Sequence, residues 1–561
     1  MNSGVFGRRR YLLASVAGLA LAMSLLWMAS DPLITRYYFL HQDRYVGLVY
    51  GAVLAGLAIW LPQWRHNMAA PSERTVVIVA AVLVLALWFG THALMLDYPI
   101  TRDELMARFD AEILASGRLA MPVAPEWRRF AVALTPNFLA PVAGYEKWLS
   151  SYMPGHAMLR AGLGLVADPA LLNPLLAGGG LIAIAAVARR LFPDYAGAQI
   201  VVIGGYLLSA QILVTAMTSY AMTAHLAANC LWLWLYLKDR WWSHALAMAI
   251  GVLAIGLHQI IFHPLFAGPI LLTLLARRRF ALFGAYATVY AAALLGWISY
   301  HGFATGGLGA AGGAASGMED FLTHRVLPLL LHFEPYTVPL MFFNMLRFFA
   351  WMPLFLTPLM LAAMPVVRSR EGLALPLFAG LALTVVAMAW LLPYQGHGWG
   401  YRYLHGVIPS ALLLAGFGYV RWAEFDRASA KGFVAVSAVA TLPVIIFLGV
   451  TARAFVLPYA ALSDKIERQR ADFVLIDTNY PGSAIDQVRN RPDLSNRPLI
   501  FSTELMSTWM VRELCARGTV TVMTKADYDL PAYGAPRTVN PDYDAFLRYL
   551  ARADCLLAVD P

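Results

Sequence analysis

The sequence predicts a polytopic α-helical membrane protein with a small α/β domain at its C-terminal end. Of the 561 residues, 60% are hydrophobic and only 13% are charged, whereas soluble globular chains are about 45–50% apolar and about 25% charged. Apolar runs long enough to cross a bilayer recur through residues 1–456, and shorter runs of strand length follow. This composition excludes an ordinary soluble enzyme and a disordered or fibrous chain.

Thirteen segments have about the length of apolar sequence that a membrane-spanning helix requires. They are 11–28, 45–62, 75–95, 171–190, 198–216, 219–237, 243–260, 264–276, 281–300, 342–366, 374–393, 404–422 and 433–456. The first follows three consecutive arginines but is too long for the apolar core of a signal peptide, so we expect an uncleaved anchor.

The basic residues predict the orientation of these spans. The net charge is +9, and 37 of the 42 basic residues are Arg. With the N-terminus in the cytoplasm, every inner loop carries Arg or Lys at or beside it, as the positive-inside rule requires. This orientation places four segments outside: 96–170, 301–341, 394–403 and 457–561. The scarcity of Lys and abundance of Ala and Arg indicate a GC-rich bacterial coding sequence, so we expect an inner-membrane protein with these segments in the periplasm.

Residues 1–456 form the predicted membrane domain, and residues 457–561 form the predicted periplasmic α/β domain. In the latter, runs at 473–476, 498–501, 520–523 and 556–559 have strand length, and helical patterns lie near 504–516 and 542–552. No glycine-rich phosphate loop is present, so nucleotide binding is unsupported. We expect this domain to bind an acceptor or to support the structure.

Two features of the outer segments remain open at this stage. Cys515 and Cys555 would both lie in an oxidising compartment, where they form either a disulfide or two separate thiols. The 301–341 segment begins with a Gly/Ala-rich stretch from Gly306 to Gly317. Such a stretch is typical of a lid over a site and equally of a plain linker.

The first outer segment carries the strongest local signal, the adjacent carboxylates Asp103 and Glu104. They open a helical stretch that ends near Gly117. Adjacent carboxylates at a membrane boundary are costly without a partner, which indicates a functional site. A structural interpretation is also open, because Thr101 can cap this helix and both carboxylates complement its dipole in the first turn.

Three further elements lie on the predicted outer side. Glu146-Lys147 and Tyr152-Met-Pro-Gly-His156 follow in the same segment, and Arg402-Tyr-Leu-His-Gly-Val-Ile-Pro409 opens a late span. With the Asp-Glu pair and the Ala115-Ser-Gly117 stretch followed by Pro122, these elements resemble in order and placement the GT-C glycosyltransferases. The chain is most similar in appearance to protein O-mannosyltransferases and to bacterial lipid A aminoarabinose transferases (glycosyltransferase families 39 and 83).

The resemblance covers most of 96–425 and has departures. Three predicted spans precede the Asp-Glu pair, where relatives usually have one. Met106 stands where the aminoarabinose transferases tend to have an arginine, and Trp148 follows Glu146-Lys147 in place of a proline. These departures leave the sugar and the acceptor open.

The resemblance implies an inverting glycosyltransferase whose donor is a sugar on a polyprenyl phosphate, with the lipid tail among the helices and the sugar-phosphate facing the outer site. Membrane lipids are further expected partners. A carboxylate must take the proton of the acceptor hydroxyl, and inversion in one displacement needs a single such base. We assign this role to Asp103, with Glu104 as helper, metal ligand or alternative base. The acceptor would be a periplasmic lipid, glycan or protein.

A growing negative charge on the phosphate leaving group requires a cation. Arg402 is the first candidate and Lys147 the second, although Arg402 could instead be an interfacial anchor. Further candidates for binding the donor phosphate or sugar are Glu146, Tyr152, His156, His397, Tyr403 and His405. No cofactor is certain. A divalent cation is a candidate, and its candidate ligands are Asp103, His156, His258 and His263.

A transporter or flippase of a lipid-linked saccharide or another envelope precursor is the main alternative, and a polymer ligase would use the same kind of donor. Transporters place charges within spans and often show repeat symmetry. The predicted span interiors here are nearly free of charged residues, and no clear two-fold repeat is visible. Nothing in the sequence indicates a nucleic-acid partner.

Overall fold

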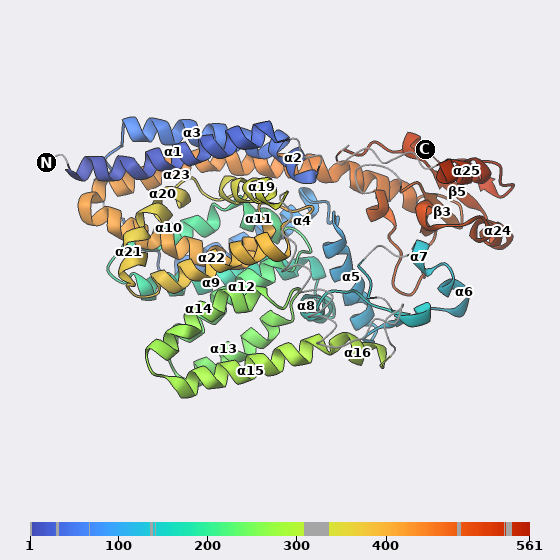
Figure 1. Ribbon diagram of the computed structural model, residues 1–561, viewed down its shortest axis with the longest axis horizontal. Coiled ribbons are helices and arrows are strands. Elements are labelled where there is room, and N and C mark those ends of the chain that lie inside the picture. Colours follow the sequence, from blue (N-terminus) through green and yellow to red (C-terminus); the bar gives the residue numbers. More distant parts are fainter. Residues whose placement is uncertain are drawn as a thin grey trace.

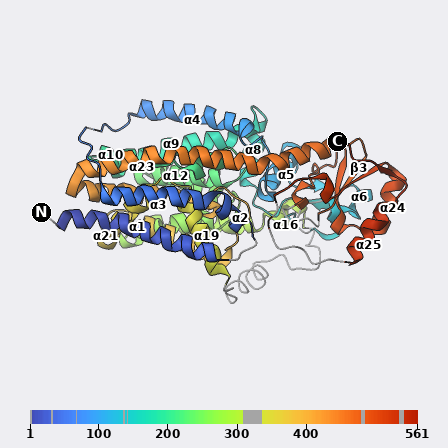
Figure 2. The same ribbon diagram turned by 90° about the horizontal axis from the view of Figure 1, so that it is seen from above.

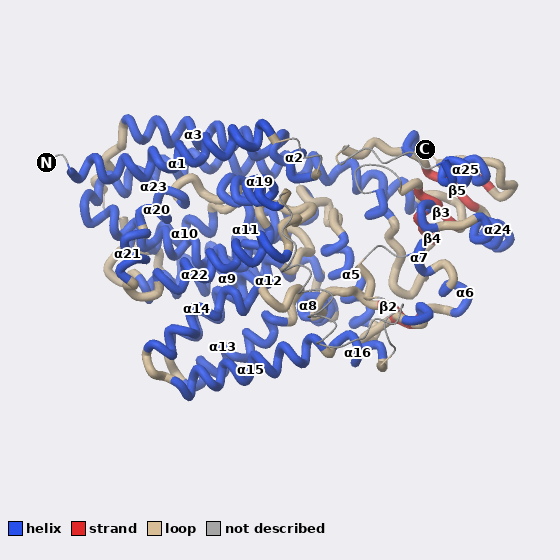
Figure 3. Tube along the Cα trace, viewed as in Figure 1, coloured by secondary structure: helices blue, strands red, loops and turns tan. Residues whose placement is uncertain are grey.

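Helices dominate the structure, a computed structural model that describes residues 3–29, 33–66, 68–134, 138–140, 142–307, 336–478, 484–531, 533 and 541–560 (Figure 1). The N-terminus lies at one end of the long axis, and the C-terminal strands lie near the other (Figures 1 and 3). Most of the predicted 301–341 loop falls at 308–335, outside the described residues.

The helices before the first outer segment are α1 Ser3–Met28, α2 Ile34–Tyr38, the π-helical η1 Phe39–Asp43, α3 Arg44–Ile59 and α4 Glu73–Ala93. The outer segment contains α5 Arg102–Ala115, β1 Met121–Pro122, α6 Pro125–Arg128, α7 Ala131–Leu134, η2 Ala143–Tyr145, β2 Lys147–Trp148, α8 Gly155–Gly164 and η3 Pro169–Leu171. Strands β1 and β2 pair antiparallel, with Met121 opposite Trp148.

The remaining helices of the bundle follow along the chain as α9 Leu172–Leu191, α10 Ala196–Leu207, α11 Ala210–Ala216, α12 Met222–Lys238, α13 Trp241–Ile255, α14 Phe262–Ala276, α15 Phe280–Ile298, α16 Tyr300–Thr305, α19 Thr337–Ala350, α20 Leu356–Ala362, α21 Met364–Ser369, α22 Ala374–Leu391, η5 Arg402–Val407 and α23 Ile408–Glu467. Helix α23 runs along most of the bundle (Figure 2) and has non-helical backbone at Asp426. It continues past the predicted domain boundary at 456.

Within the described residues, six helices are long and apolar enough to cross a membrane, or seven if the bent pair α10–α11 counts as one span. The two last predicted spans are joined in α23. Several other predicted spans fold as shorter apolar helices, among them α13, α14 and α19. The mostly helical membrane fold is therefore observed, whereas the count of thirteen spans stays a prediction.

The C-terminal residues form a four-stranded parallel sheet in the order β4-β3-β5-β6. Its elements are β3 Phe473–Ile476, η6 Ala484–Gln487, β4 Leu499–Ser502, η7 Thr503–Leu505, α24 Thr508–Arg517, β5 Val520–Met523, η8 Lys525–Asp527, α25 Pro541–Leu550 and β6 Leu556–Leu557. Their positions coincide closely with the predicted strand and helix segments. Strands β3, β4 and β5 are mostly buried, as expected of parallel strands.

The C-terminal sheet shares a hydrophobic core with the first outer segment. Met106 and Phe109 of α5, together with Trp148, belong to the same buried cluster as Phe473 and Phe501 of the sheet. Hydrophobic burial is the dominant favourable term in packing of this kind. The first outer segment and the C-terminal residues therefore form one packed unit at the end of the bundle.

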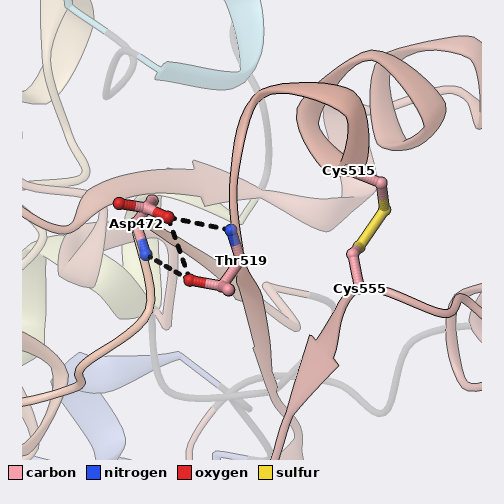
Figure 4. The surroundings of a disulfide bond; sticks show 4 residues. All are labelled: Asp472, Cys515, Thr519 and Cys555. Atoms are coloured by element: carbon pink, nitrogen blue, oxygen red, sulfur yellow. Dashed lines mark hydrogen bonds between the residues drawn. A yellow bond between two sulfur atoms is a disulfide. The ribbon is translucent and has the colours of Figure 1, made fainter.

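Cys515 of α24 and Cys555 before β6 are joined by a disulfide (Figure 4), which is one of the two alternatives that the sequence left open. Nearby, the Asp472 carboxylate accepts hydrogen bonds from the backbone N–H (2.8 Å) and hydroxyl (2.9 Å) of Thr519. The disulfide therefore ties α24 to the start of β6, next to a hydrogen-bonded connection between Asp472 and Thr519. Cys230 is buried and free in α12.

Candidate functional site

Helix α5 begins where its capping chemistry predicts. Thr101 has extended backbone (φ −127°, ψ 161°), and its hydroxyl accepts a hydrogen bond from the backbone N–H of Glu104 at 3.3 Å. A side-chain oxygen at this position satisfies a donor that the first turn leaves free. The cap fixes Asp103 and Glu104 in the first helical turn, and their side chains have different partners.

Asp103 lies in a buried cluster of polar side chains drawn from distant parts of the chain. Its carboxylate forms an ion pair with Arg402 and accepts a hydrogen bond from the Tyr152 hydroxyl. His258 Nε2 lies 4.0 Å from Asp103 Oδ2, the oxygen that pairs with Arg402. The side chains of Asp103 and Arg402 are each 9% exposed. A charge pair this deeply buried is costly unless its members are well partnered.

Arg402 begins η5 and is held by the preceding turn. Its backbone N–H donates to Gln395 Oε1 at 3.0 Å, and its Nε donates to the Gln395 carbonyl at 2.8 Å. The guanidinium also lies over the rings of Tyr220 and Tyr403, at 5.5 and 4.9 Å. Arg402 therefore points at Asp103 inside the protein, which is a different position from that of an anchor reaching to lipid headgroups.

Glu104 faces away from this cluster. It is fully buried, and its carboxylate accepts a hydrogen bond from the Ser219 backbone N–H at 3.1 Å. It forms no ion pair with any residue that the structure describes, and burial raises its pKa to about 7. The geometry gives Glu104 a role in joining α5 to the turn before α12, and separates it from the partners of Asp103.

Tyr152 and His258 form the aromatic side of the Asp103 cluster. Their ring centroids lie 4.2 Å apart. His258 lies in the turn between α13 and α14. Burial raises the pKa of Tyr152, so this hydroxyl keeps its proton near pH 7 and donates it to the hydrogen bond with the carboxylate.

The four candidate metal ligands have different partners. His258 lies 4.0 Å from Asp103, whereas His156 contacts Asn173 at 3.1 Å and His263 contacts Asn229 at 2.8 Å and Tyr290 at 3.1 Å. Among the described residues, no group of three or more His, Cys, Asp or Glu side chains has the geometry to hold a metal ion. The divalent cation therefore stays a prediction.

The second predicted cation and its neighbour lie elsewhere. Lys147 donates to the carbonyl of Thr305 at 3.3 Å, and Glu146 lies 3.9 Å from Arg128 with half its side chain exposed. No contact between described residues joins either one to Asp103 or Arg402. The geometry therefore favours Arg402 over Lys147 as the cation of the site.

The other predicted binding residues lie near Arg402 but in different surroundings. Tyr403 is buried against the guanidinium. His405 is fully buried, and neither of its ring nitrogens bonds to a described residue. His397 contacts Tyr533 at 2.6 Å and Tyr38 at 3.4 Å, and burial lowers its pKa to about 4.

Sequence reasoning missed a second buried ion pair, between Asp43 and Arg347. The Arg347 Nη1 lies 3.0 Å from Asp43 Oδ2, and its other nitrogens donate to the carbonyls of Gly398 and Gly400. The signal that could have found it is Arg347 itself, an arginine within the predicted span 342–366. A charged residue inside a span is by default a functional or structural site with a partner.

No family model matches the sequence, and no curated protein matches it. Among solved structures, the chain is similar to ArnT from Cupriavidus metallidurans, a lipid A aminoarabinose transferase, in its apo state (13% identity, TM-score 0.48). That match covers 74% of this chain and 84% of ArnT. The structure of the same protein bound to undecaprenyl phosphate matches with 14% identity and a TM-score of 0.51, over 74% of this chain and 85% of that one. The resemblance that the motifs indicate is thus confirmed at the level of the fold: the chain is a multi-pass membrane protein with an ArnT-like fold.

Proposed function

We propose that this protein is an inverting glycosyltransferase that moves a sugar from a polyprenyl-phosphate donor to an acceptor at the periplasmic face of the inner membrane. The observation that carries the proposal is the buried pair of Asp103 and Arg402 with Tyr152 and His258 beside it. This cluster brings together a candidate base and a candidate phosphate-binding cation, the two groups that the reaction needs. The shared fold with ArnT, solved with undecaprenyl phosphate bound, supports a lipid-phosphate donor.

The reaction is a single displacement at the anomeric carbon. The acceptor hydroxyl forms the new C–O bond while its proton passes to the Asp103 carboxylate. The bond between the anomeric carbon and the phosphate oxygen breaks, and its electron pair leaves on that oxygen. Arg402 stabilises the charge that develops there, because a guanidinium in a water-poor site interacts strongly with a phosphate.

Donor binding would free the base. Without substrate, the Arg402 guanidinium is paired with Asp103 and held by the carbonyl of Gln395. A donor phosphate competes with the Asp103 carboxylate for the same guanidinium, because both are anions that arginine binds through two N–H donors. Once the phosphate takes this position, Asp103 keeps the Tyr152 hydrogen bond and can accept a proton.

The test is Asp103→Asn in purified protein, supplied with a panel of undecaprenyl-phosphate-linked monosaccharides and bacterial envelope extract as acceptor. We expect the release of undecaprenyl phosphate to fall by about 100-fold or more, the range for loss of a general base. Binding of undecaprenyl phosphate itself should be kept, because Arg402 is unchanged. The matched control is Asp97→Asn, which removes a carboxylate of the same segment that pairs with Arg108.

Two results would contradict the proposal. An Asp103→Asn variant that releases undecaprenyl phosphate at the wild-type rate would remove Asp103 from the chemistry. A wild-type protein that turns over no donor of the panel, yet moves an intact lipid-linked sugar across proteoliposomes, would favour a flippase. Mass spectrometry of envelope glycolipids and glycans after deletion of the gene would identify the sugar and the acceptor.

A further inference from the structure

A short segment of the C-terminal residues, Asp486–Arg489, lies against the start of α5. Asp486 Oδ1 is 2.5 Å from the Nε of Arg102, and the two side chains are 7% and 19% exposed. Arg102 immediately precedes Asp103 in the chain. The ion pair therefore holds the first residue of the helix that carries the candidate base.

Two more contacts fix the residues just before this helix. Arg489 donates to the carbonyl of Pro99 at 2.6 Å, and its guanidinium lies 4.0 Å from the centre of the Tyr98 ring. Gln487 donates to the Tyr98 hydroxyl at 2.9 Å. Arg489 also donates to the carbonyl of Asp486 at 2.7 Å, so the segment is braced internally. Residues 98–102 are thus held at both ends by one segment.

The C-terminal residues also contact the other half of the site. The Tyr533 hydroxyl lies 2.6 Å from His397 Nε2, in the 394–403 turn that carries Arg402. The shared hydrophobic core stabilises the packing of α5 against the sheet, but hydrophobic contact is non-directional and does not fix the orientation of a side chain. The ion pair and hydrogen bonds supply the directional constraints, and they lie at the two ends of the Asp103–Arg402 pair.

We propose that the C-terminal domain positions the catalytic carboxylate, with Asp486 as the positioning residue that acts through Arg102. This inference rests on the proposed glycosyl transfer and gives a role to a domain that the sequence left between acceptor binding and support. The physical reason is geometric: a shift of about 1 Å at a reacting group can lower a rate about 100-fold even when it originates far from the chemistry. Binding of the donor phosphate depends on Arg402 and is not affected.

The experiment compares Asp486→Asn with the charge-exchanged double variant Arg102→Asp/Asp486→Arg in the full-length protein. Undecaprenyl phosphate release gives kcat and the donor KM, and direct binding of undecaprenyl phosphate gives Kd. We expect Asp486→Asn to lower kcat by about tenfold or more while KM and Kd stay within about twofold. The double variant should recover part of kcat. Asp493→Asn is the matched control, since the side chain of this exposed residue of the same domain accepts hydrogen bonds only from Ser495 among the described residues.

The outcomes separate this inference from the proposed function. A wild-type protein without donor turnover would refute the transferase proposal itself. An active wild type with unchanged kcat in Asp486→Asn would overturn the positioning role alone. A parallel loss of kcat, undecaprenyl phosphate binding and thermal stability would also overturn it, because the ion pair would then serve only folding. If Asp486→Asn does not fold, Tyr98→Phe provides a milder variant, which should lower kcat by a smaller factor with the same unchanged Kd.

Discussion

Two buried aspartate–arginine pairs attach to the same 394–403 turn, yet their surroundings differ. Arg347 is 1% exposed and binds Asp43, Gln42 and the carbonyls of Gly398 and Gly400. Asp43 also accepts a hydrogen bond from the Trp351 indole at 3.0 Å. All of these partners are fixed parts of the helical bundle and the turn. The Asp43–Arg347 pair is therefore saturated by the protein itself.

The Asp103–Arg402 pair joins parts of the chain that lie far apart in the sequence. Asp103 comes from α5, Tyr152 precedes α8, and His258 lies between α13 and α14. Among the described residues, Asp103 has one hydroxyl donor besides Arg402, and the histidine stands 4.0 Å away. The Asp43–Arg347 pair is thus the more completely partnered of the two, and this difference favours Arg402 as the proposed phosphate-binding cation.

The largest expected difference is in stability. Arg347→Met leaves Asp43 as an uncompensated buried charge and should cost about 3–5 kcal/mol. Arg402→Met should cost less, because its partner is nearer to the surface, but should abolish binding of undecaprenyl phosphate. Thermal unfolding in detergent and a direct binding measurement with undecaprenyl phosphate check the two halves of this prediction.

A surface pair gives the reference for this comparison. Arg279 pairs with Asp239, and both side chains are more than a third exposed, so Arg279→Met should change stability by about 0–1 kcal/mol. Equal destabilisation by Arg347→Met and Arg279→Met would show that the buried pair is not a structural element. Normal undecaprenyl phosphate binding by Arg402→Met would show that the second pair is not the phosphate site.

Motif order and capping chemistry were enough to select Asp103 and Arg402, which the structure brings together, and to predict the start of α5; the chemical roles of the two residues stay predictions. Thr101, Asp103 and Arg402 carry local signals, because a cap residue, an acidic pair and an arginine among aromatic residues are visible without a fold. The strand runs of the C-terminal sheet were predictable for the same reason, since buried parallel strands are continuous apolar runs.

Partner choice over long sequence separation was not predictable. Glu104 and Asp103 are adjacent, yet one bonds to Ser219 and the other to Arg402, because successive helical residues point about 100° apart. Lys147 carries the same charge as Arg402 but packs against the end of α16. The interpretation of the spans as nearly free of charge also missed Arg347. Its partner Asp43 lies about 300 residues earlier in the chain, and the packing of α19 against η1 brings the two together.

Glu104 is a third buried carboxylate, which forms no ion pair with a described residue, and it predicts a pH-dependent stability. Its pKa is raised from 4.5 to about 7, so the folded state holds the proton more tightly than the unfolded chain. The contribution of Glu104 to the free energy of unfolding is fully present below pH 4.5 and is lost as the pH rises through about 7. Raising this pKa from 4.5 to about 7 corresponds to about 3 kcal/mol.

The measurement is the difference in thermal stability between wild type and Glu104→Gln at pH 5 and pH 8. The introduced glutamine can accept from Ser219 and donate to Thr101, as the protonated acid does. We therefore expect the variant to match wild type at pH 5 and to exceed it at pH 8. Asp110, with a pKa raised to about 7, is common to both proteins and cancels. Glu112→Gln, an exposed change on the same helix, is the control and should have the same thermal stability as wild type at both pH values. If Glu104→Gln keeps the pH dependence of the wild type, the effect belongs to another group.

Among changes to the two buried pairs, the smallest expected effects come from removing the second donor of each aspartate, and they test the comparison most directly. Tyr152→Phe removes the hydroxyl on Asp103 but keeps the ring against His258. Trp351→Phe removes the indole N–H on Asp43. If the Asp103–Arg402 pair acts in catalysis and the Asp43–Arg347 pair supports the fold, Tyr152→Phe should mainly lower kcat. Trp351→Phe should then lower the free energy of unfolding.

Each loss has a definite size. A hydrogen bond to a charged group contributes about 1.5–3 kcal/mol, so Trp351→Phe should lower the unfolding free energy by that amount while kcat stays unchanged.

Tyr152→Phe should lower kcat about tenfold or more, equivalent to about 1.4 kcal/mol or more, because Asp103 loses the contact that orients it after the phosphate has taken Arg402. Its melting temperature should fall less than that of Trp351→Phe, because Tyr152 is only partly buried whereas Trp351 is fully buried, so water can replace the lost hydroxyl on Asp103. Tyr300→Phe, which changes a buried tyrosine at the start of α16, controls for loss of a hydroxyl. The reverse pattern, with stability lost at Tyr152 and rate lost at Trp351, would exchange the roles of the two pairs and place the donor phosphate at Arg347.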